Sequence, residues 1–155
     1  MRVISGKSRG KKLVSLEGDN TRPTLDRVKE ALFNIIQFDI KDAVVLDLFA
    51  GTGALGVEAL SRGAKEVIFC DKVPNAIKVI KQNVTNTNNL DKATIINKDC
   101  KDVLEDLSKQ NKKLDIVFLD PPYRTNLAIE SMQKIIMSNL LTKRRNCYYR
   151  NRWYK

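Results

Sequence analysis

Apolar residues follow two alternating patterns along most of this chain. Short, nearly continuous apolar runs are typical of strands buried on both faces of a parallel sheet, and they predict strands over residues 43–48, 66–70, 93–97 and 114–119. Between these runs the apolar residues recur at helical spacing, which predicts helices over 53–61, 74–86, 100–109 and 127–141. Because strands and helices alternate, we predict an α/β fold with a doubly wound, mostly parallel sheet and right-handed crossovers.

The first forty residues show a different pattern. Two short strand-like runs, 2–4 and 11–14, surround Gly6 and Gly10 and predict a small β-hairpin. From Thr24 onward, apolar residues at helical spacing predict a helix. The length of 155 residues is that of a single domain. We divide it into an N-terminal hairpin and helix (1–40), an α/β core (41–141) and a basic tail (142–155).

The amino-acid composition excludes several kinds of catalytic and metal site. The chain has no histidine, which excludes histidine-based nucleophilic triads, imidazole bases and histidine-ligated metals. Cys70, Cys100 and Cys147 lack metal-site spacing and predict reduced thiols. The sequence has neither an apolar run long enough to cross a membrane nor a signal-peptide stretch, so we expect a cytoplasmic protein.

The formal net charge of +10 predicts a polyanionic partner. Basic residues cluster near the N-terminus, where no acidic residue precedes Glu17. A solvated basic hairpin explains this cluster equally well from charge alone. The residues that we expect to hold phosphates are Arg2, Lys7, Arg9, Lys11, Arg22, Arg27 and Lys29.

A glycine-rich loop, Gly51-Thr52-Gly53-Ala54-Leu55-Gly56, follows the first core strand, and Asp71 ends the next strand. Taken alone, this pattern fits a dinucleotide site with the acid on a ribose hydroxyl. An S-adenosylmethionine loop uses the same elements. Asp47, which ends the first strand, favours the methyl donor, because a carboxylate repels a pyrophosphate and attracts a sulfonium and an amino group.

Acidic residues end four predicted strands: Asp47, Asp71, Asp99 and Asp120. Ligands bind at the carboxyl ends of the strands in open parallel sheets, although one or two of these acids could be helix caps. We expect Asp99 and Cys100 near the adenine, and no metal in the site. The predicted cofactor-binding residues are Asp47, Phe49, Ala50, Gly51, Gly53, Asp71, Lys72, Asp99 and Cys100.

The tetrapeptide Asp120-Pro121-Pro122-Tyr123 predicts a catalytic element for a planar amine. An exocyclic amine is a weak nucleophile because its lone pair is delocalised into the ring. The Asp120 side chain and the Pro121 carbonyl can accept its two hydrogens and localise that pair, and consecutive prolines hold the carbonyl rigidly. Tyr123 can stack on the base. A base within paired nucleic acid would have to leave its stack.

With these residues, the chain resembles the bacterial RsmD-type family, which methylates the N2 amine of a guanine in 16S ribosomal RNA. The resemblance covers about residues 1–141, and its most specific part is the block from Arg22 to Glu30. It implies a Rossmann-like S-adenosylmethionine-dependent fold, S-adenosylhomocysteine as a product, and ribosomal RNA or an assembling small subunit as partner. It also implies that Thr24 lies near the RNA. The other matching segments are 2–6, 47–56, 58–63 and 120–123.

The tail departs from this family, in which a fifth strand and an antiparallel hairpin follow. Residues 142–155 show no apolar strand pattern, so we expect the last strands of the sheet to be missing, through a truncated or shifted reading frame. The strand 114–119 would then be an exposed edge that favours association. Two other functions stay open: a DNA adenine-N6 methyltransferase, which shares the amine chemistry, and an inactive cofactor-binding module.

Overall fold

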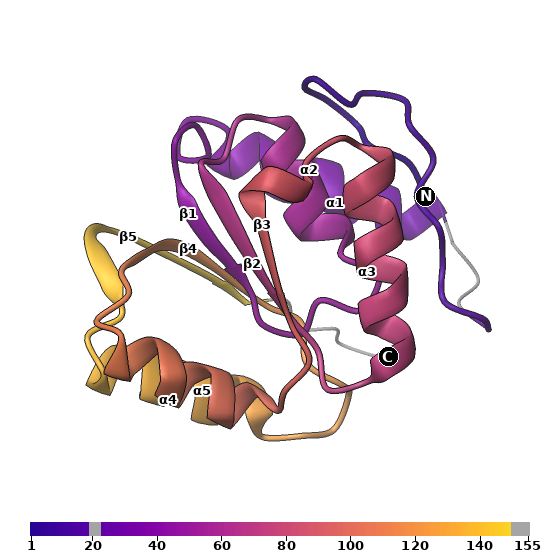
Figure 1. The fold of residues 1–155 in the computed structure, drawn as a ribbon. Coiled ribbons are helices and arrows are strands. Elements are labelled where there is room, and N and C mark those ends of the chain that lie inside the picture. Colours follow the sequence, from indigo (N-terminus) through magenta and orange to yellow (C-terminus); the bar gives the residue numbers. More distant parts are fainter. Residues whose placement is uncertain (19–22, 150–155) are drawn as a thin grey trace.

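The structure is a computed structural model that describes residues 1–18 and 23–149. Within these ranges, the side chains of residues 23–25 and 143–149 are not described. Its centre is a five-stranded sheet in the order β3-β2-β1-β4-β5, in which every neighbouring pair is parallel (Figure 1). The strands are β1 (Val44–Asp47), β2 (Glu66–Cys70), β3 (Ala93–Ile96), β4 (Leu114–Leu119) and β5 (Leu141–Tyr149).

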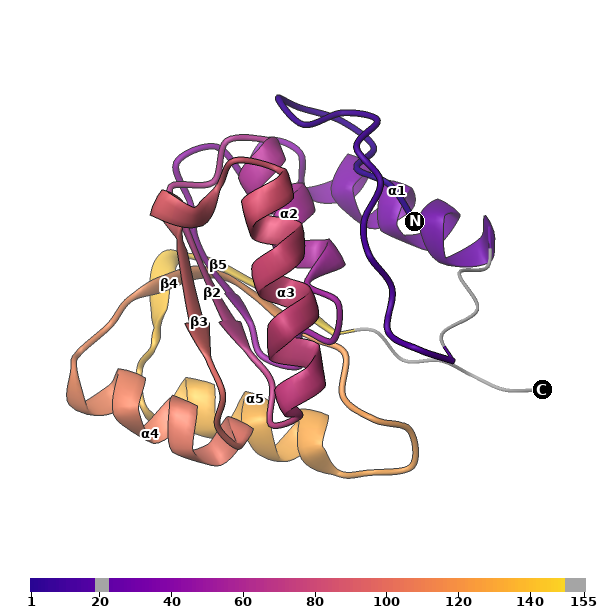
Figure 2. The same cartoon turned by 45° about the vertical axis from the view of Figure 1, so that its right-hand side comes forward.

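Helices cover both faces of the sheet. One face carries α1 (Pro23–Ile36), α2 (Ala54–Ser61) and α3 (Pro74–Asn86), and the other carries α4 (Cys100–Lys109) and α5 (Leu127–Met137) (Figures 1 and 2). A short 3-10 turn, η1 (Leu90–Lys92), leads into β3. This arrangement confirms the predicted doubly wound α/β fold.

Alternating strand residues build two separate cores. Val67 and Phe69 of β2 pack with α1, α2 and α3, whereas Ile68 and Cys70 pack with α4 and α5. Since successive side chains of a strand point to opposite faces, a strand covered on both sides must be apolar throughout. This explains why the core strands appear in the sequence as continuous apolar runs.

The predicted N-terminal hairpin is reduced to one antiparallel bridge, Arg2 with Lys12. The Val3 N–H donates to the Lys11 carbonyl at 2.9 Å, and the Gly10 N–H donates to the Val3 carbonyl at 2.9 Å. We call residues 1–14 the N-terminal arm.

Polar side chains of α2 hold this arm in place. The carboxylate of Glu58, which is fully buried, accepts the N–H groups of Ile4 at 2.9 Å and Ser5 at 3.0 Å. The Ser61 hydroxyl donates to the Ser5 carbonyl at 2.6 Å and accepts the Ser8 N–H at 2.9 Å. The segment 58–63, which matches the family in sequence, therefore serves as the docking site of the arm.

The prediction that no strand follows the last helix was wrong. Residues 141–149 form β5, which pairs in parallel with β4 through partners such as Val117 and Cys147. The strand β4 is thus an interior strand. It is not the exposed apolar edge that was predicted, and the association expected through that edge has no support. The register shifts between Leu114 and Ile116. The open hydrogen-bonding edge of β4 supplies a tertiary reason for a strand that the local sequence does not predict.

The end of the last helix and the lengths of the helices can also be compared with the sequence predictions. The last helix ends at Met137 rather than at residue 141, and β5 begins after a short turn. Across the described ranges, the structure has no helix that combines the length and apolar character needed to cross a membrane.

Candidate active site

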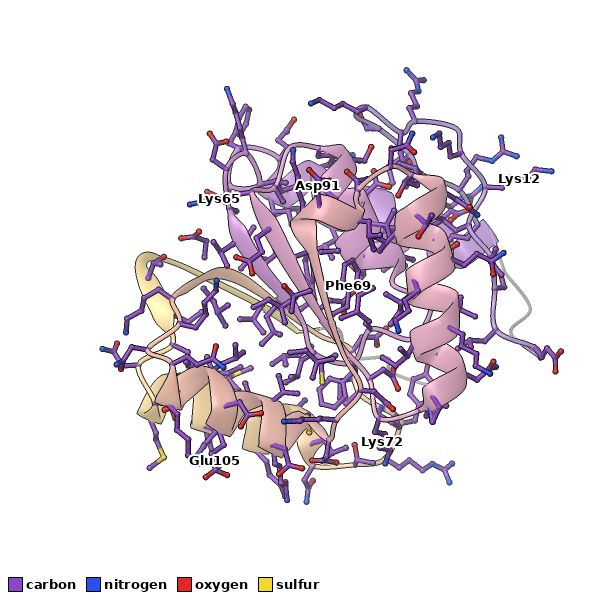
Figure 3. The ribbon with its side chains drawn as sticks, viewed as in Figure 1. Lys12, Lys65, Phe69, Lys72, Asp91 and Glu105 are labelled. Atoms are coloured by element: carbon purple, nitrogen blue, oxygen red, sulfur yellow. The ribbon has the colours of Figure 1, made fainter. Side chains whose placement is uncertain are left out.

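A pocket of about 410 Å³ lies at the carboxyl ends of the parallel strands. Figure 3 labels Lys65 and Lys72 at the two ends of β2, and Lys72 belongs to the end that carries the pocket. The lining comes from four chain segments that are far apart in the sequence. These residues are Leu48, Phe49, Gly51, Cys70, Asp71, Lys72, Val73, Lys98, Asp99, Cys100, Asp120, Pro121, Pro122, Tyr123 and Leu127.

The glycine loop forms a tight turn between β1 and α2. Gly51 and Gly53 have φ angles of 57° and 78°, a left-handed conformation that glycine adopts without steric cost. The Gly53 N–H donates to the Ala50 carbonyl at 2.7 Å, and the Ala50 N–H donates to the Cys70 carbonyl at 2.9 Å. Gly51 lines the pocket, whereas Ala50 and Gly53, which were also predicted to bind the cofactor, are not among the lining residues.

Asp71 connects the glycine loop to the start of α3. Its Oδ2 accepts the Gly51 N–H at 2.9 Å and its Oδ1 accepts the Val73 N–H at 2.9 Å. Asp99 is the N-cap of α4, because its Oδ1 accepts the Lys101 N–H at 2.9 Å. One of the four predicted acids is therefore a helix cap, and both of these carboxylates also line the pocket.

Asp47 is buried and is not among the residues that line the pocket. Only 2% of the residue is exposed, and its Oδ2 accepts the Gly56 N–H at 3.1 Å. Burial is the main cause that raises the pKa of Asp47 to about 7; the Gly56 hydrogen bond opposes it, and the nearby charges of Asp120 and Asp71 add to it. The three carboxylates are thus close enough to feel one another electrostatically, as expected for a site that attracts a cation.

Two thiols face the same pocket. Burial raises the pKa of Cys70 to about 12, and burial followed by the charge of Asp99 raises the pKa of Cys100. The Cys100 Sγ lies 3.8 Å from Asp99 Oδ1. Both groups therefore remain neutral thiols at physiological pH and add polarisable, largely apolar surface to this part of the pocket.

The segment Asp120-Pro121-Pro122-Tyr123 follows β4 directly and lines the pocket. The Pro122 carbonyl accepts the Thr125 hydroxyl at 2.9 Å, which closes a turn after the two prolines. Tyr123 is 51% exposed, so its ring stands at the rim. The sequence-predicted catalytic element and most of the predicted cofactor residues therefore share one cavity.

The predicted RNA-binding residues fall into three groups. Arg2, Lys7, Arg9, Lys11 and Arg27 are exposed. Arg22 lies outside the described residues, and the structure does not describe the side chain of Thr24. Lys29 forms the third group, because it is buried.

Lys29 is buried, with 4% of the residue exposed. Its Nζ donates to the Arg2 carbonyl at 2.9 Å and lies 3.5 Å from the buried Glu58 carboxylate. Burial lowers the pKa of Lys29, and the neighbouring charge of Glu58 opposes that effect. The prediction that Lys29 contacts phosphates was wrong, because a lysine in this position joins the N-terminal arm to α1 and α2 instead.

Several residues that line the pocket were not predicted from the sequence. Leu48, Val73, Lys98 and Leu127 line the pocket, and each lies within two residues of the end of a strand or the start of a helix. Their position near the end of a strand or the start of a helix is the feature of the sequence that could have identified them as pocket residues. Asn83, discussed below, gave no such signal because it lies in the middle of an amphipathic helix.

Comparison with solved structures places this fold in a class of proteins. The chain superposes on a structure titled "Putative methyltransferase yhhF from Escherichia coli" with a TM-score of 0.79 and 36% identity, covering 92% of this chain and 75% of that one. A methylase structure from Haemophilus influenzae gives a TM-score of 0.72 and 38% identity, covering 91% and 75% of the two chains. The fold is thus a Rossmann-like fold of the S-adenosylmethionine-dependent methyltransferase class.

The sequence comparisons are more specific. The family model described as "Conserved hypothetical protein 95" matches residues 1–152, and the chain belongs to this family. It is 40% identical over 142 residues to "Ribosomal RNA small subunit methyltransferase D" of Haemophilus influenzae, which covers 91% of this chain and 73% of the relative. The Escherichia coli protein of the same name is 37% identical, covering 85% and 65%.

Proposed function

We propose that this protein is an S-adenosylmethionine-dependent methyltransferase that acts on small-subunit ribosomal RNA, with the N2 amine of a guanine as its target. The observation that carries the proposal is that one pocket is lined by both the strand-end carboxylates and the Asp-Pro-Pro-Tyr segment. The names of the similar proteins support ribosomal RNA as the substrate. The guanine N2 position rests on the resemblance of the sequence to the RsmD-type family.

The negatively charged side chains of the pocket fit a cationic nucleoside better than a dinucleotide. The Gly51 N–H, which would be an obvious donor to a pyrophosphate, is already bound by Asp71. The carboxylates of Asp71, Asp99 and Asp120 line the cavity, and Asp47 is close enough for the charges of Asp120 and Asp71 to raise its pKa. A positive sulfur and an amino group balance this charge, whereas phosphates would add to it.

The protein's own groups would prepare the target amine. When bound, S-adenosylmethionine supplies a methyl group whose bond to sulfur breaks as the bond to nitrogen forms, with the electron pair staying on sulfur. The Asp120 carboxylate and the Pro121 carbonyl accept hydrogen bonds from the two N–H groups of the amine. The nitrogen lone pair is then localised on the nitrogen and points away from the plane of the ring. The proton that the product amine loses leaves through Asp120 to water. Tyr123 holds the base by stacking, a contact worth about 1–3 kcal/mol.

The exposed residues of the N-terminal arm would hold the RNA backbone. Arg2, Lys7 and Arg9 are exposed on an arm whose backbone is bound at several points by α2. A pre-ordered set of cations binds phosphates without first losing chain entropy. We therefore assign phosphate binding to this arm and base recognition to the Asp-Pro-Pro-Tyr segment.

Transfer of a labelled methyl group tests the proposal. The substrates are small-subunit RNA, assembled small subunits and duplex DNA, and calorimetric titration compares S-adenosylmethionine with NAD. We expect methylation of the RNA or of the subunit, and binding of the methyl donor alone. Nuclease digestion of the product should give N2-methylguanosine. Transfer to duplex DNA, or binding of NAD in place of the methyl donor, would contradict the proposal.

A variant pair links the activity to the pocket. Asp120→Ala should reduce transfer by about 100-fold or more, as loss of one aligned polar contact to a transition state does, and should leave donor affinity nearly unchanged. Asp91→Ala is the matched control, because Asp91 is an exposed acid at the opposite end of β3 (Figure 3). Full activity of the Asp120 variant would remove the proposed amine contact.

A further inference from the structure

A buried amide joins two parts of the chain that the proposed function treats separately. Asn83, on α3, is fully buried. Its Oδ1 accepts the Val14 N–H at 2.7 Å, and its Nδ2 donates to the carbonyls of Val14 at 3.0 Å and Thr52 at 2.9 Å. Both N–H groups of the amide are therefore used. One partner lies at the end of the N-terminal arm and the other in the middle of the glycine loop.

The contact with Thr52 holds the loop from its far side. Thr52 stands between Gly51 and Gly53, both of which have positive φ angles. Its carbonyl belongs to the same peptide plane as the Gly53 N–H, which donates to Ala50 at 2.7 Å. Asp71 holds the Gly51 N–H from the pocket side. The loop conformation is thus fixed between Asp71 and Asn83, and of these two only Asp71 lines the pocket.

The contact with Val14 fixes the place where the arm leaves α3. The reciprocal pair between the Asn83 amide and Val14 binds both polar groups of that residue's backbone. Two further bonds seat the arm on the end of α3. The Lys11 Nζ donates to the Asn86 carbonyl at 2.9 Å, and the Ser8 hydroxyl donates to the Thr87 carbonyl at 3.2 Å. The arm that carries exposed cations and the loop at the cofactor pocket therefore share a buried side chain.

We propose that Asn83 is a positioning residue that holds the glycine loop and the basic arm as one pre-organised unit, so that donor affinity and RNA affinity both depend on it. The identity of the two ligands rests on the proposed function. Asn83 touches neither ligand site, so it acts through the backbone of Thr52 on one side and of Val14 on the other. Flexible loops bind ligands less tightly because binding must first order them.

The test compares a substitution at Asn83 with one at Thr87, the residue that directly follows α3. Asn83→Asp keeps the acceptor for the Val14 N–H but replaces the amide donor with a carboxylate oxygen that faces the carbonyls of Val14 and Thr52. Thr87→Val is the matched control, because this buried hydroxyl donates only to carbonyls of its own helix, Asn83 at 2.8 Å and Val84 at 3.1 Å. Calorimetry with S-adenosylmethionine and filter binding with a small-subunit RNA fragment give the two affinities.

We expect Asn83→Asp to weaken both affinities by about tenfold each, because the glycine loop and the arm each lose one hydrogen bond donated by Asn83 in a buried site. Thr87→Val should lower thermal stability and leave both affinities within about twofold of the wild type. A folded Asn83 variant with wild-type affinity for either ligand would overturn the proposal. An equal loss of affinity in the Thr87 variant would overturn it too, because general destabilisation would then explain both results.

Hydrogen exchange on the wild-type protein tests the same link without a mutation. Saturating S-adenosylmethionine should slow exchange of the Val14 N–H, which is bound to Asn83, more than exchange of the Val3 N–H, which is bound to Lys11. Equal responses of the two amides would contradict the proposal. A wild-type protein that does not bind S-adenosylmethionine would instead remove the proposed function, so the two failures are distinguishable.

Discussion

Single buried charges have a large effect on this protein because they lie where water cannot screen them. Asp47 is the clearest case, since it combines almost complete burial with one backbone hydrogen bond and two nearby carboxylates. Sequence reasoning placed it in contact with a cationic ligand. Because Asp47 does not line the pocket, we expect it to act on the site through its charge rather than by direct contact.

Asp47 should make stability depend on pH. Its pKa is raised from 3.8 to about 7 in the folded protein, so the folded state keeps a proton that the unfolded chain releases. The stability difference between the wild type and Asp47→Asn should be most favourable to the wild type below pH about 4. It should then fall by roughly 4 kcal/mol as the pH rises to 7. Urea unfolding of both proteins between pH 4 and 8 measures this difference, and parallel stability curves would contradict the prediction.

Lys29 should behave as a structural residue. Lys29→Met removes one partner of a buried ion pair and should reduce the free energy of unfolding by about 3 kcal/mol. Arg27→Met, two residues earlier on the same helix and exposed, should have little effect on stability and should weaken RNA binding. Denaturant unfolding and filter binding measure the two quantities. A Lys29 variant with normal stability and weakened RNA binding would restore the original interpretation.

At the scale of elements, the docking of the N-terminal arm on α2 decides how the basic residues are presented. Gly6 is the point of closest approach. Its φ is 86°, and a Cβ at this position would lie 1.9 Å from the Ser61 carbonyl oxygen. The Lys7 N–H donates to that same oxygen at 2.9 Å. Any side chain at position 6 must therefore push the arm off the helix.

Two glycine substitutions separate the steric effect from the backbone effect. Gly10 has a similar φ of 82° but would place its Cβ in open space. Gly10→Ala should cost about 1–2 kcal/mol, the cost of a left-handed conformation. Gly6→Ala should cost at least about 2 kcal/mol more, because the arm also loses hydrogen bonds. Chemical denaturation compares the two, and equal losses of stability would show that the contact with Ser61 is not important.

At the scale of the whole molecule, the net charge of +10 is unevenly placed. The acids of the pocket gather at one edge of the sheet, whereas exposed cations extend along the arm, where Figure 3 labels Lys12. This separation allows one molecule to attract a cationic donor into a cavity and a polyanion to its outer surface.

RNA binding should accordingly depend strongly on salt. The logarithm of the affinity should fall linearly with the logarithm of the salt concentration, with a slope of about −0.7 for each phosphate contacted in single-stranded RNA. Arg9→Gln should reduce the magnitude of that slope by about one contact. The control Lys65→Gln should not, because Figure 3 shows Lys65 on the opposite side of the molecule from Lys12. An unchanged slope for Arg9→Gln would exclude this residue from the phosphate contacts.

The order of strands and helices in the core was predictable from the sequence. Strands covered on both faces need continuous apolar runs, and helices covered on one face need apolar residues at helical spacing, so the local pattern contains the information. The bounds predicted for 66–70, 74–86, 100–109 and 114–119 agree with the structure. The strand-end acids were predictable too, since each follows an apolar run, and three of them share the pocket with the Asp-Pro-Pro-Tyr segment.

The tertiary structure alone decided the rest. The strand β5 forms although its sequence lacks an apolar pattern, because the open edge of β4 offers it hydrogen bonds. Lys29 and Arg27 are both basic residues of α1, yet only the former meets a buried carboxylate from α2. Asn83 joins residues that are 69 and 31 positions away. The sequence by itself determined which elements form and which chemistry stands at their ends, because both depend on neighbouring residues. Burial and long-range partners depend on how the elements pack, and these required the folded chain.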